Sequence, residues 1–248
     1  MSLIDRWQKE GRILSIAHRG ASGQAPENTL AAFSKALEIG ADAIELDLHR
    51  TRDGHLVVIH NGIVDRTTGN RGIVADMSLK ELKSLDAGSQ FHPDFSDQQI
   101  PTFQEVIELV KGKAKICAEL KVKGLEEDVV QTIEQNNIKD EIIVISFLHQ
   151  SLNKVKQLDA QISTGMLVGI KKVTRAPLLV RKAREISADV VMLPWSFTTA
   201  ELVEGVHKEG LFITVWTVDE PSEMNRLIKI GVDGIATNYP ERLKEVLG

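Results

Sequence analysis

Acidic and basic side chains occur in pairs within two apolar segments of the sequence. Glu45 and Asp47 stand two residues apart in AIELDL, and Glu119 and Lys121 stand two residues apart in CAELKV. Successive side chains of a β-strand point to opposite faces, so residues two apart share a face. If both segments are strands, each pair therefore projects from one face of its strand.

Three carboxylates that converge on one small site cannot all stay ionised unless a cation neutralises them. Carboxylate oxygens favour a hard ion, Mg²⁺ or Ca²⁺, over Zn²⁺. We therefore predict that Glu45, Asp47 and Glu119 hold one divalent cation. A purely structural cluster of ion pairs is the weaker alternative, because unpaired buried charge is costly.

Two histidines are expected to reach the same site. His18 follows the first apolar segment of the chain, and His60 ends the segment HLVVIH. The Asp-Gly pair that follows Arg52 favours a hairpin with a two-residue turn. Such a turn would pair Arg52 with His55 and, in the same register, Asp47 with His60.

Four further residues have both a structural and a functional interpretation. Asn28 and Thr29 are most simply helix caps. Glu27 is a charge at a helix start, or a group of the site if it turns toward the other residues. Trp216 fits a packed core or the wall that contacts an apolar edge of a substrate.

Apolar segments of strand length alternate along the chain with amphipathic segments of helical period. Strands are expected at residues 13–17, 43–48, 114–120, 142–146, 162–167, 190–193, 212–216 and 234–236. Helical segments between them include residues 29–39, 103–110, 125–136, 177–186, 199–209 and 221–230. This alternation predicts an α/β fold, a closed (β/α)₈ TIM barrel.

The chemistry-bearing residues stand at the ends of the expected strands. His18 and Arg19 follow the first strand, and the two pairs of charged residues close the second and third strands. Active sites of such barrels form at the carboxyl ends of the strands. The barrel therefore predicts that these side chains meet at one end, the mouth.

One segment interrupts the alternation. More than fifty residues separate the expected strand at 43–48 from the helix at 103–110, which is too long for a simple link. We interpret residues 62–100 as a small inserted segment that caps the barrel mouth. Because no linker-like composition separates this insertion, residues 1–248 are expected to form a single domain.

The composition limits which partners and which cellular location we expect for this protein. A formal net charge of −5 gives no general attraction for nucleic acid. The single Cys117 excludes an internal disulfide and fits a buried strand residue. The start of the chain lacks a signal-peptide core, and no apolar segment is long enough to span a bilayer, so we expect a cytoplasmic protein without stable membrane insertion. Monomer and homodimer stay open.

The segment IAHRGASGQAPENTL, with AIELDLHRTRDGHLVVIHN after it, resembles the signature region of the glycerophosphodiester phosphodiesterase family. Later motifs occur in the family's order along nearly the whole chain, namely ELK at 119–121, SF at 146–147, VWTV at 215–218 and DGIATNYP at 233–240. The resemblance implies a TIM barrel with a small insertion after its second strand. It also implies hydrolysis of a glycerophosphodiester, such as glycerophosphocholine or glycerophosphoethanolamine, to sn-glycerol 3-phosphate and an alcohol.

The resemblance also implies roles for individual residues. It makes His18 and His60 the acid/base pair, Glu45, Asp47 and Glu119 the metal ligands, and Arg19 and Lys121 the cations that face phosphate. Glu27, Asn61 and Trp216 are further candidates for substrate binding. The sequence leaves open which histidine is the base, and whether water or the 2-hydroxyl of glycerol attacks.

Two other functions remain as alternatives. A phosphodiesterase of lysophospholipase D type would act on longer lipids, and apolar residues of the insertion would supply the path to its mouth. A non-catalytic protein that only binds phosphodiesters would keep Arg19 and Lys121 but would not need both His18 and His60. A comparison of a glycerophosphodiester with a lysophospholipid as substrates distinguishes the first alternative.

Overall fold

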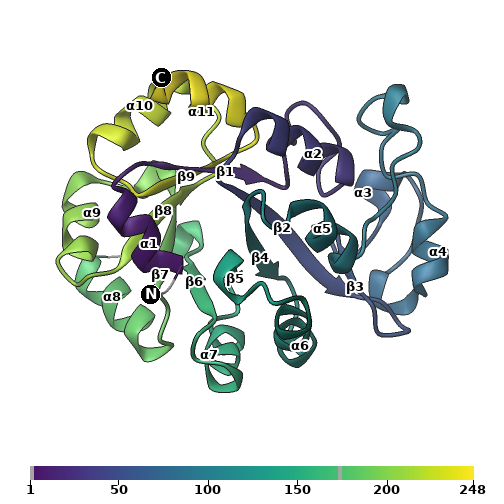
Figure 1. Cartoon of the computed structure of the whole chain (residues 1–248), viewed down its shortest axis with the longest axis horizontal. Helices are drawn as coiled ribbons and strands as arrows, with labels where there is room; N and C mark the ends of the chain where they lie inside the picture. The colour runs from purple at the N-terminus through teal and green to yellow at the C-terminus, as the bar shows by residue number, and fades with distance from the viewer. Residues whose placement is uncertain (1–2, 173–174) are drawn as a thin grey trace.

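The computed structural model describes residues 3–172 and 175–248 (Figure 1). Within this part, nine strands form one sheet. The strands are β1 (Leu14–His18), β2 (Ala43–Arg50), β3 (Leu56–Val58), β4 (Lys115–Leu120), β5 (Ile142–Ser146), β6 (Ser163–Leu167), β7 (Val190–Pro194), β8 (Phe212–Trp216) and β9 (Gly234–Thr237). All eight predicted strands are present, with ends that differ by at most two residues.

Most helices lie between strands in the chain, whereas α1 precedes the first strand and α11 follows the last. The helices are α1 (Leu3–Glu10), α2 (Leu30–Ile39), α3 (Asp65–Thr68), α4 (Leu79–Lys83), α5 (Phe103–Val110), α6 (Glu126–Asn136), α7 (His149–Leu158), α8 (Ala176–Glu185), α9 (Ala200–His207), α10 (Pro221–Lys229) and α11 (Pro240–Leu247). Short 3₁₀ turns are η1 (Val74–Asp76), η2 (Pro93–Phe95), η3 (Lys139–Glu141), η4 (Ile170–Lys172) and η5 (Trp195–Phe197). In the described part of the chain, no helix is sufficiently long and apolar to cross a bilayer.

The sheet closes into a barrel. Its strand order is β1-β9-β8-β7-β6-β5-β4-β2, and β1 also pairs with β2, which joins the two ends. Every pair in this ring is parallel, whereas β3 pairs antiparallel with β2 outside the ring. The predicted (β/α)₈ TIM barrel is therefore confirmed.

Apolar side chains fill both sides of the barrel wall. Ile44 and Leu46 belong to the large core between the strands and the outer helices. Cys117 and Phe212 belong to the core inside the barrel, which also contains Trp7 from α1. The rings of Trp7 and Phe212 lie 6.0 Å apart. Helix α1, for which the sequence analysis predicts no element, therefore closes the amino-terminal end of the barrel and leaves the opposite end open for a site (Figure 1).

The register of the β2–β3 hairpin corrects the predicted one by a single residue. Leu48 pairs with Val58, and the backbone N–H of Ile59 donates to the carbonyl oxygen of Asp47 over 3.0 Å. Asp47 is therefore opposite Ile59 and not opposite His60. The predicted pairing of Asp47 with His60 is wrong, although the hairpin itself is present.

The length of the turn explains the difference. The backbone N–H of Thr51 donates to the carbonyl oxygen of His55, which leaves three residues between them instead of two. Gly54, the last of the three, has a φ of 88°. An Asp-Gly pair suits both turn lengths, because a three-residue turn also requires a left-handed residue.

The inserted segment has a small apolar core of its own with β3 and lies beside the barrel (Figure 1). Val64 and Leu82 from the insertion pack in this core with Val57 and Ile59 from the hairpin. Ser78 caps helix α4 through a reciprocal hydrogen bond with Glu81. Because the insertion packs on residues of the hairpin, its position is coupled to that of β2. That the segment caps the mouth stays a prediction.

Candidate active site

Seven of the ten predicted site residues line one cavity at the carboxyl ends of the strands, whereas Asp47, Glu27 and Asn61 are not part of its lining. The cavity has a volume of about 130 Å³. Its polar wall consists of His18, Arg19, Glu45, His60, Glu119 and Lys121, and its apolar wall consists of Ile145, Phe147, Leu167, Met192 and Trp216. The fold therefore joins side chains from loops and strands that are far apart in the sequence.

The three carboxylates form a compact buried cluster. Glu45 and Asp47 project from β2 and Glu119 from β4, and one oxygen of each lies within 4.8 Å of the others. The register of β2 and β4 places Asp47 beside Glu119. Oδ1 of Asp47 is buried and has no hydrogen-bond partner among the described residues. An all-oxygen set that includes a buried oxygen without a hydrogen bond fits a hard divalent cation.

Burial and mutual repulsion raise the pKa of two of these carboxyl groups. Burial raises the pKa of Glu119 to about 7, and Asp47 adds to the rise against the attraction of Lys121. Burial also raises the pKa of Glu45 well above its usual value, followed by repulsion from Asp47 and Glu119. Glu45 and Glu119 therefore bind protons more readily than free glutamates do, and a bound cation would compete with those protons.

Asp47 is the carboxylate that neighbouring cations keep ionised. Burial opposes its ionisation, but Lys121 and Arg19 outweigh burial and lower its pKa. Lys121 Nζ lies 3.3 Å from Asp47 Oδ1 and 3.0 Å from Glu119 Oε1, and Arg19 Nε lies 3.3 Å from Asp47 Oδ2. Both predicted phosphate-facing cations thus line the cavity and already contact its carboxylates.

The loop after β1 brings Arg19 into the cavity through a sharp turn. Arg19 and Gly20 have φ values of 58° and 81°. A Cβ atom on Gly20 would lie 2.6 Å from the backbone carbon of Ala32, so only glycine permits this approach of the loop to α2. The turn directs the backbone N–H of Arg19 to Glu45 Oε2, over 2.9 Å.

Asn28 and Thr29 have different roles, although both were predicted as helix caps. Thr29 is the N-cap of α2, and its side chain accepts from the backbone N–H of Ala32. Asn28 is buried with a φ of 57°, and its Nδ2 donates to Asp47 Oδ2 over 2.8 Å. The cap prediction is therefore wrong for Asn28, because tertiary contact with Asp47 takes its side chain away from the helix.

His18 is held by a chain of polar side chains. Its Nδ1 lies 2.7 Å from Asn238 Oδ1, while Asn238 Nδ2 donates to Asp219 Oδ2 over 2.7 Å. The carboxylate fixes the amide orientation, so the oxygen of Asn238 faces the ring and Nδ1 carries the proton. Nε2 is then the unprotonated nitrogen. Burial, with Arg19 as the second cause, lowers the pKa of His18 to about 4.

His60 has a similar support. Its Nδ1 lies 2.8 Å from Asn61 Oδ1, so Asn61 holds the ring. Burial lowers the pKa of His60, while Asp47 opposes this shift. The ring of His49 contacts the backbone oxygen of His60 over 3.3 Å. His60 reaches the cavity because β3 ends before it and the chain bends there.

Glu27 lies between two arginines. Arg66 of the insertion forms two hydrogen bonds with it, of 2.5 and 2.6 Å, and Arg19 forms a third of 3.1 Å. Burial opposes its ionisation, but the bonds from Arg66 and the charge of Arg19 lower the pKa of Glu27. Glu27 therefore links the insertion to Arg19.

Trp216 lies on the apolar wall. Its Nε1 donates to the carbonyl oxygen of Met192 over 3.2 Å, and its ring meets that of Phe147 edge to face at 5.6 Å. Of its two interpretations, the wall of the cavity is the one that this position supports. The ring is fixed on both sides, which gives the wall a defined shape.

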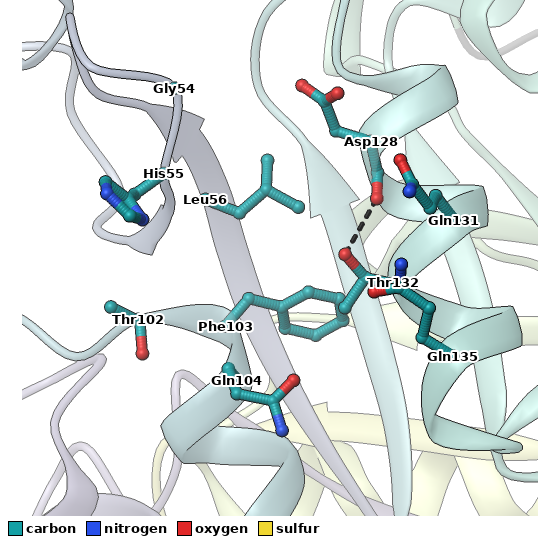
Figure 2. Close-up of a pocket in the computed structure, with 10 residues that line it drawn as sticks. All are labelled: Gly54, His55, Leu56, Thr102, Phe103, Gln104, Asp128, Gln131, Thr132 and Gln135. Atoms are coloured by element: carbon teal, nitrogen blue, oxygen red, sulfur yellow. Dashed lines mark hydrogen bonds between the residues drawn. The ribbon is translucent and has the colours of Figure 1, made fainter.

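A larger groove of about 420 Å³ lies elsewhere, on the outside of the barrel (Figure 2). It is formed by the hairpin turn at His55, the start of α5 at Phe103 and the outer side of α6. Figure 2 shows Thr132 donating to the backbone oxygen of Asp128, over 2.7 Å, within α6. The groove contains none of the predicted site residues, so its size alone does not mark the active site.

The sequence analysis missed three supporting residues. Asn238 and Asp219 orient His18, and Arg66 pairs with Glu27. For Asn238 a signal was present, because it directly follows the last strand at the carboxyl end of the barrel. Asp219 stands in a loop and Arg66 in the four-residue helix α3, which is too short for a periodic pattern, so only the folded chain shows their partners.

Comparisons with known proteins show which proteins this chain is similar to. The family model described as Glycerophosphoryl diester phosphodiesterase family matches residues 18–242. A glycerophosphodiester phosphodiesterase of Caldanaerobacter subterraneus subsp. tengcongensis is 42% identical over 94% of this chain and 96% of that protein. A glycerophosphodiester phosphodiesterase of Bacillus subtilis is 34% identical over 95% of this chain and 86% of that protein.

A similar solved structure is that of a phosphodiesterase from Oleispira antarctica in complex with the product sn-glycerol 3-phosphate. It has a TM-score of 0.86 and 28% identity, and the match covers 96% of this chain and 98% of that chain. The likeness therefore extends over the whole barrel and the insertion.

Proposed function

This chain belongs to the glycerophosphoryl diester phosphodiesterase family, and we propose that it hydrolyses glycerophosphodiesters such as glycerophosphocholine or glycerophosphoethanolamine to sn-glycerol 3-phosphate and an alcohol. One observation carries the proposal, namely the cavity that joins an acidic cluster, two cations and two histidines. The product bound to the Oleispira protein supports sn-glycerol 3-phosphate as a product here.

Glu45, Asp47 and Glu119 would hold Mg²⁺ or Ca²⁺. A divalent cation bound there would stabilise negative charge that develops on the phosphoryl oxygens. Arg19 and Lys121 supply further positive charge on the same wall of the cavity. A phosphodiester anion repels nucleophiles, and these side chains bind it and reduce that repulsion.

His18 and His60 would carry the protons. One imidazole removes a proton from the attacking hydroxyl group while a new bond to phosphorus forms. As the bond between phosphorus and the alcohol oxygen breaks, the other ring donates a proton to that oxygen. If the 2-hydroxyl of glycerol attacks, a cyclic phosphate forms first, and water then opens it.

The apolar wall favours a second candidate substrate class. Phe147 and Trp216 give this side of the cavity an aromatic surface, and Ile63, Ile73 and Phe91 of the insertion are exposed. Such side chains suit the glycerol carbons of a small diester and also the chain of a lysophospholipid. A lysophospholipase D activity is therefore the alternative to a small glycerophosphodiester substrate.

One experiment tests both candidates. The protein is incubated with glycerophosphocholine, glycerophosphoethanolamine and lysophosphatidylcholine, each with chelator, Mg²⁺ or Ca²⁺, and the products are identified. We expect sn-glycerol 3-phosphate and free alcohol from the two small diesters, and only with a divalent cation. Faster release of choline from the lysophospholipid would favour the alternative, and full activity after exhaustive chelation would contradict the proposed ligands.

A further inference from the structure

Four neighbouring loops at the mouth together expose large apolar side chains and lysines. They follow β4, β5, β6 and β7, and we call them together the β4–β7 rim, which consists of residues 121–125, 147–148, 168–172 and 195–199. These four strands are consecutive neighbours in the barrel wall. Loops at the carboxyl ends of adjacent barrel strands emerge on the same end of the molecule. The four loops therefore emerge beside one another at the mouth, and two of them contribute Lys121 and Phe147 to the cavity.

Each loop of the rim exposes one large apolar side chain. The exposed fractions are 38% for Val122, 39% for Phe147, 54% for Ile170 and 46% for Phe197. A single exposed apolar residue is common on protein surfaces. Its repetition in four adjacent loops is different, because grouped apolar exposure marks surfaces that contact another molecule or a membrane.

The charged residues of the rim are all basic. The rim contains Lys121, Lys123, Lys171 and Lys172 and no Asp or Glu, in a chain whose formal net charge is −5. Arg175, directly before α8, adds another cation beside it, while of the carboxylates directly after residue 125 Glu126 is buried and Glu127 is paired with Lys154. Lys121 pairs with the carboxylates of the cavity, whereas the other three lysines of the rim have no ion pair to a described residue.

Attraction of an anionic substrate explains the lysines of the rim but not its exposed apolar side chains. Cations around a cavity steer a small phosphodiester toward it, but steering needs no exposed apolar side chains. An anionic bilayer is complementary to both features, since apolar side chains enter the headgroup region and lysines are attracted to acidic lipids. We propose that the β4–β7 rim attaches the protein reversibly to an anionic lipid surface, with the mouth of the cavity toward the lipids.

This attachment goes beyond the proposed hydrolysis and does not require it. The rim lies on the lipid surface and does not span the bilayer. A few lysines and four apolar side chains give a weak contact, and salt screens its electrostatic part. The contact is therefore expected to depend strongly on ionic strength and on lipid charge.

Vesicle co-sedimentation of the full chain tests the proposal. Vesicles of phosphatidylcholine with phosphatidylglycerol are compared with vesicles of phosphatidylcholine alone, in chelator so that no divalent ion bridges protein and lipid. We expect binding to the anionic vesicles only, and a decline of this binding as salt increases. Equal binding to both vesicles would overturn the proposal.

Two variants separate the charged and apolar contributions of the rim. Lys171→Gln with Lys172→Gln should lower the partition onto anionic vesicles about 25-fold, since each cation near such a surface contributes about fivefold. Ile170→Ser with Phe197→Ser should also lower it, because the apolar contact is lost. If the serine variant binds as the wild type does, the apolar side chains do not contact the lipids and the proposal fails.

Matched controls lie at the opposite end of the barrel. Lys182 and Lys229 occupy the last turns of α8 and α10, and both are exposed. Lys182→Gln with Lys229→Gln removes the same charge as the rim variant but should leave vesicle binding unchanged. Equal losses in this control and in the rim variant would mean that net charge, and not the rim, drives binding.

Two further measurements complete the test. Turnover of soluble glycerophosphocholine should stay at the wild-type level in the rim variants, because none of the altered residues lines the cavity. Light scattering reports the oligomeric state. If the rim variants dissociate an oligomer and bind vesicles as the wild type does, the rim is a contact between copies of this chain, and the lipid proposal is overturned.

Discussion

At the scale of single residues, each cavity histidine has an asparagine at Nδ1. Asn238 holds His18 and Asn61 holds His60, both through the amide oxygen. For a neutral ring, donation from Nδ1 leaves Nε2 as the basic nitrogen. Because Asp219 fixes the amide of Asn238, this tautomer is assigned to His18, and the proposed acid/base roles require one of the two rings to be protonated.

Replacement of either histidine tests these roles. His18→Ala and His60→Ala are expected to lower turnover of glycerophosphocholine about 10²–10⁴-fold, because general acid/base catalysis contributes this much. The melting temperature should change little, since both side chains border a cavity. His55→Ala, on the exposed hairpin turn, is the control and should retain activity. Wild-type turnover in a cavity variant would remove that residue from the mechanism.

The raised pKa of Glu119 predicts how metal binding depends on pH. Its value of about 7 means that below pH 7 the folded protein carries a proton there, which a metal ion must displace. Affinity for Mg²⁺ should therefore be about tenfold lower at pH 6 than at pH 8, because the ionised fraction falls by that factor. Titration calorimetry in buffers of different ionisation enthalpy should show proton release at pH 6. Equal affinity at both pH values would contradict this linkage.

At the scale of elements, Arg66 connects the insertion to the site. Arg66 from α3 binds Glu27, and Glu27 binds Arg19 in the cavity. These charge-assisted hydrogen bonds, which are stronger than neutral ones, join the insertion to the loop after β1 and to the cavity. This contact gives the insertion a way to affect the site, although most of its apolar core packs on the hairpin.

Removal of this link should affect activity more than stability. Arg66→Ala is expected to lower kcat/KM several-fold, because Glu27 loses its two hydrogen bonds from Arg66 and then orients Arg19 less firmly. The free energy of unfolding should change by less than about 1 kcal/mol, since an arginine that is this exposed contributes little to stability. Arg66→Lys should restore part of the activity. The control is Arg52→Ala, which breaks an exposed pair with Glu81 away from the cavity. If both alanine variants have equal activity, the link does not position Arg19.

At the scale of the whole molecule, the β2–β3 hairpin belongs both to the sheet of the barrel and to the apolar core of the insertion. Val57 and Ile59 of the hairpin belong to the core of the insertion, while β2 belongs to the barrel wall. The insertion therefore cannot keep its core when β2 and β3 separate. We propose that the chain folds as a single domain.

Calorimetry checks this proposal. Thermal unfolding should give one transition whose calorimetric and van't Hoff enthalpies agree. Saturating Mg²⁺ should raise the midpoint temperature of this transition without splitting it into two, because a ligand that binds only the folded state stabilises the whole cooperative unit. A separate transition at lower temperature, removed by deletion of the insertion, would show that the insertion unfolds independently.

Local patterns were sufficient for much of the fold and for part of the site. The alternation of strand and helix segments predicted the barrel, and the two-residue spacing of Glu45 and Asp47 predicted their shared face. Such patterns succeed because a strand repeats every two residues and a helix every 3.6, whatever surrounds them. The motif order also identified the family, as the comparisons confirm.

What the sequence alone determined is therefore the set of elements and the faces on which their side chains lie. The hairpin register, the contact of Asn28 with Asp47 and the support of His18 by Asn238 were decided only by tertiary structure. The physical reason is the distance along the chain. Periodicity reports neighbours within an element, whereas Asn238 and His18 are 220 residues apart and meet only when the barrel closes.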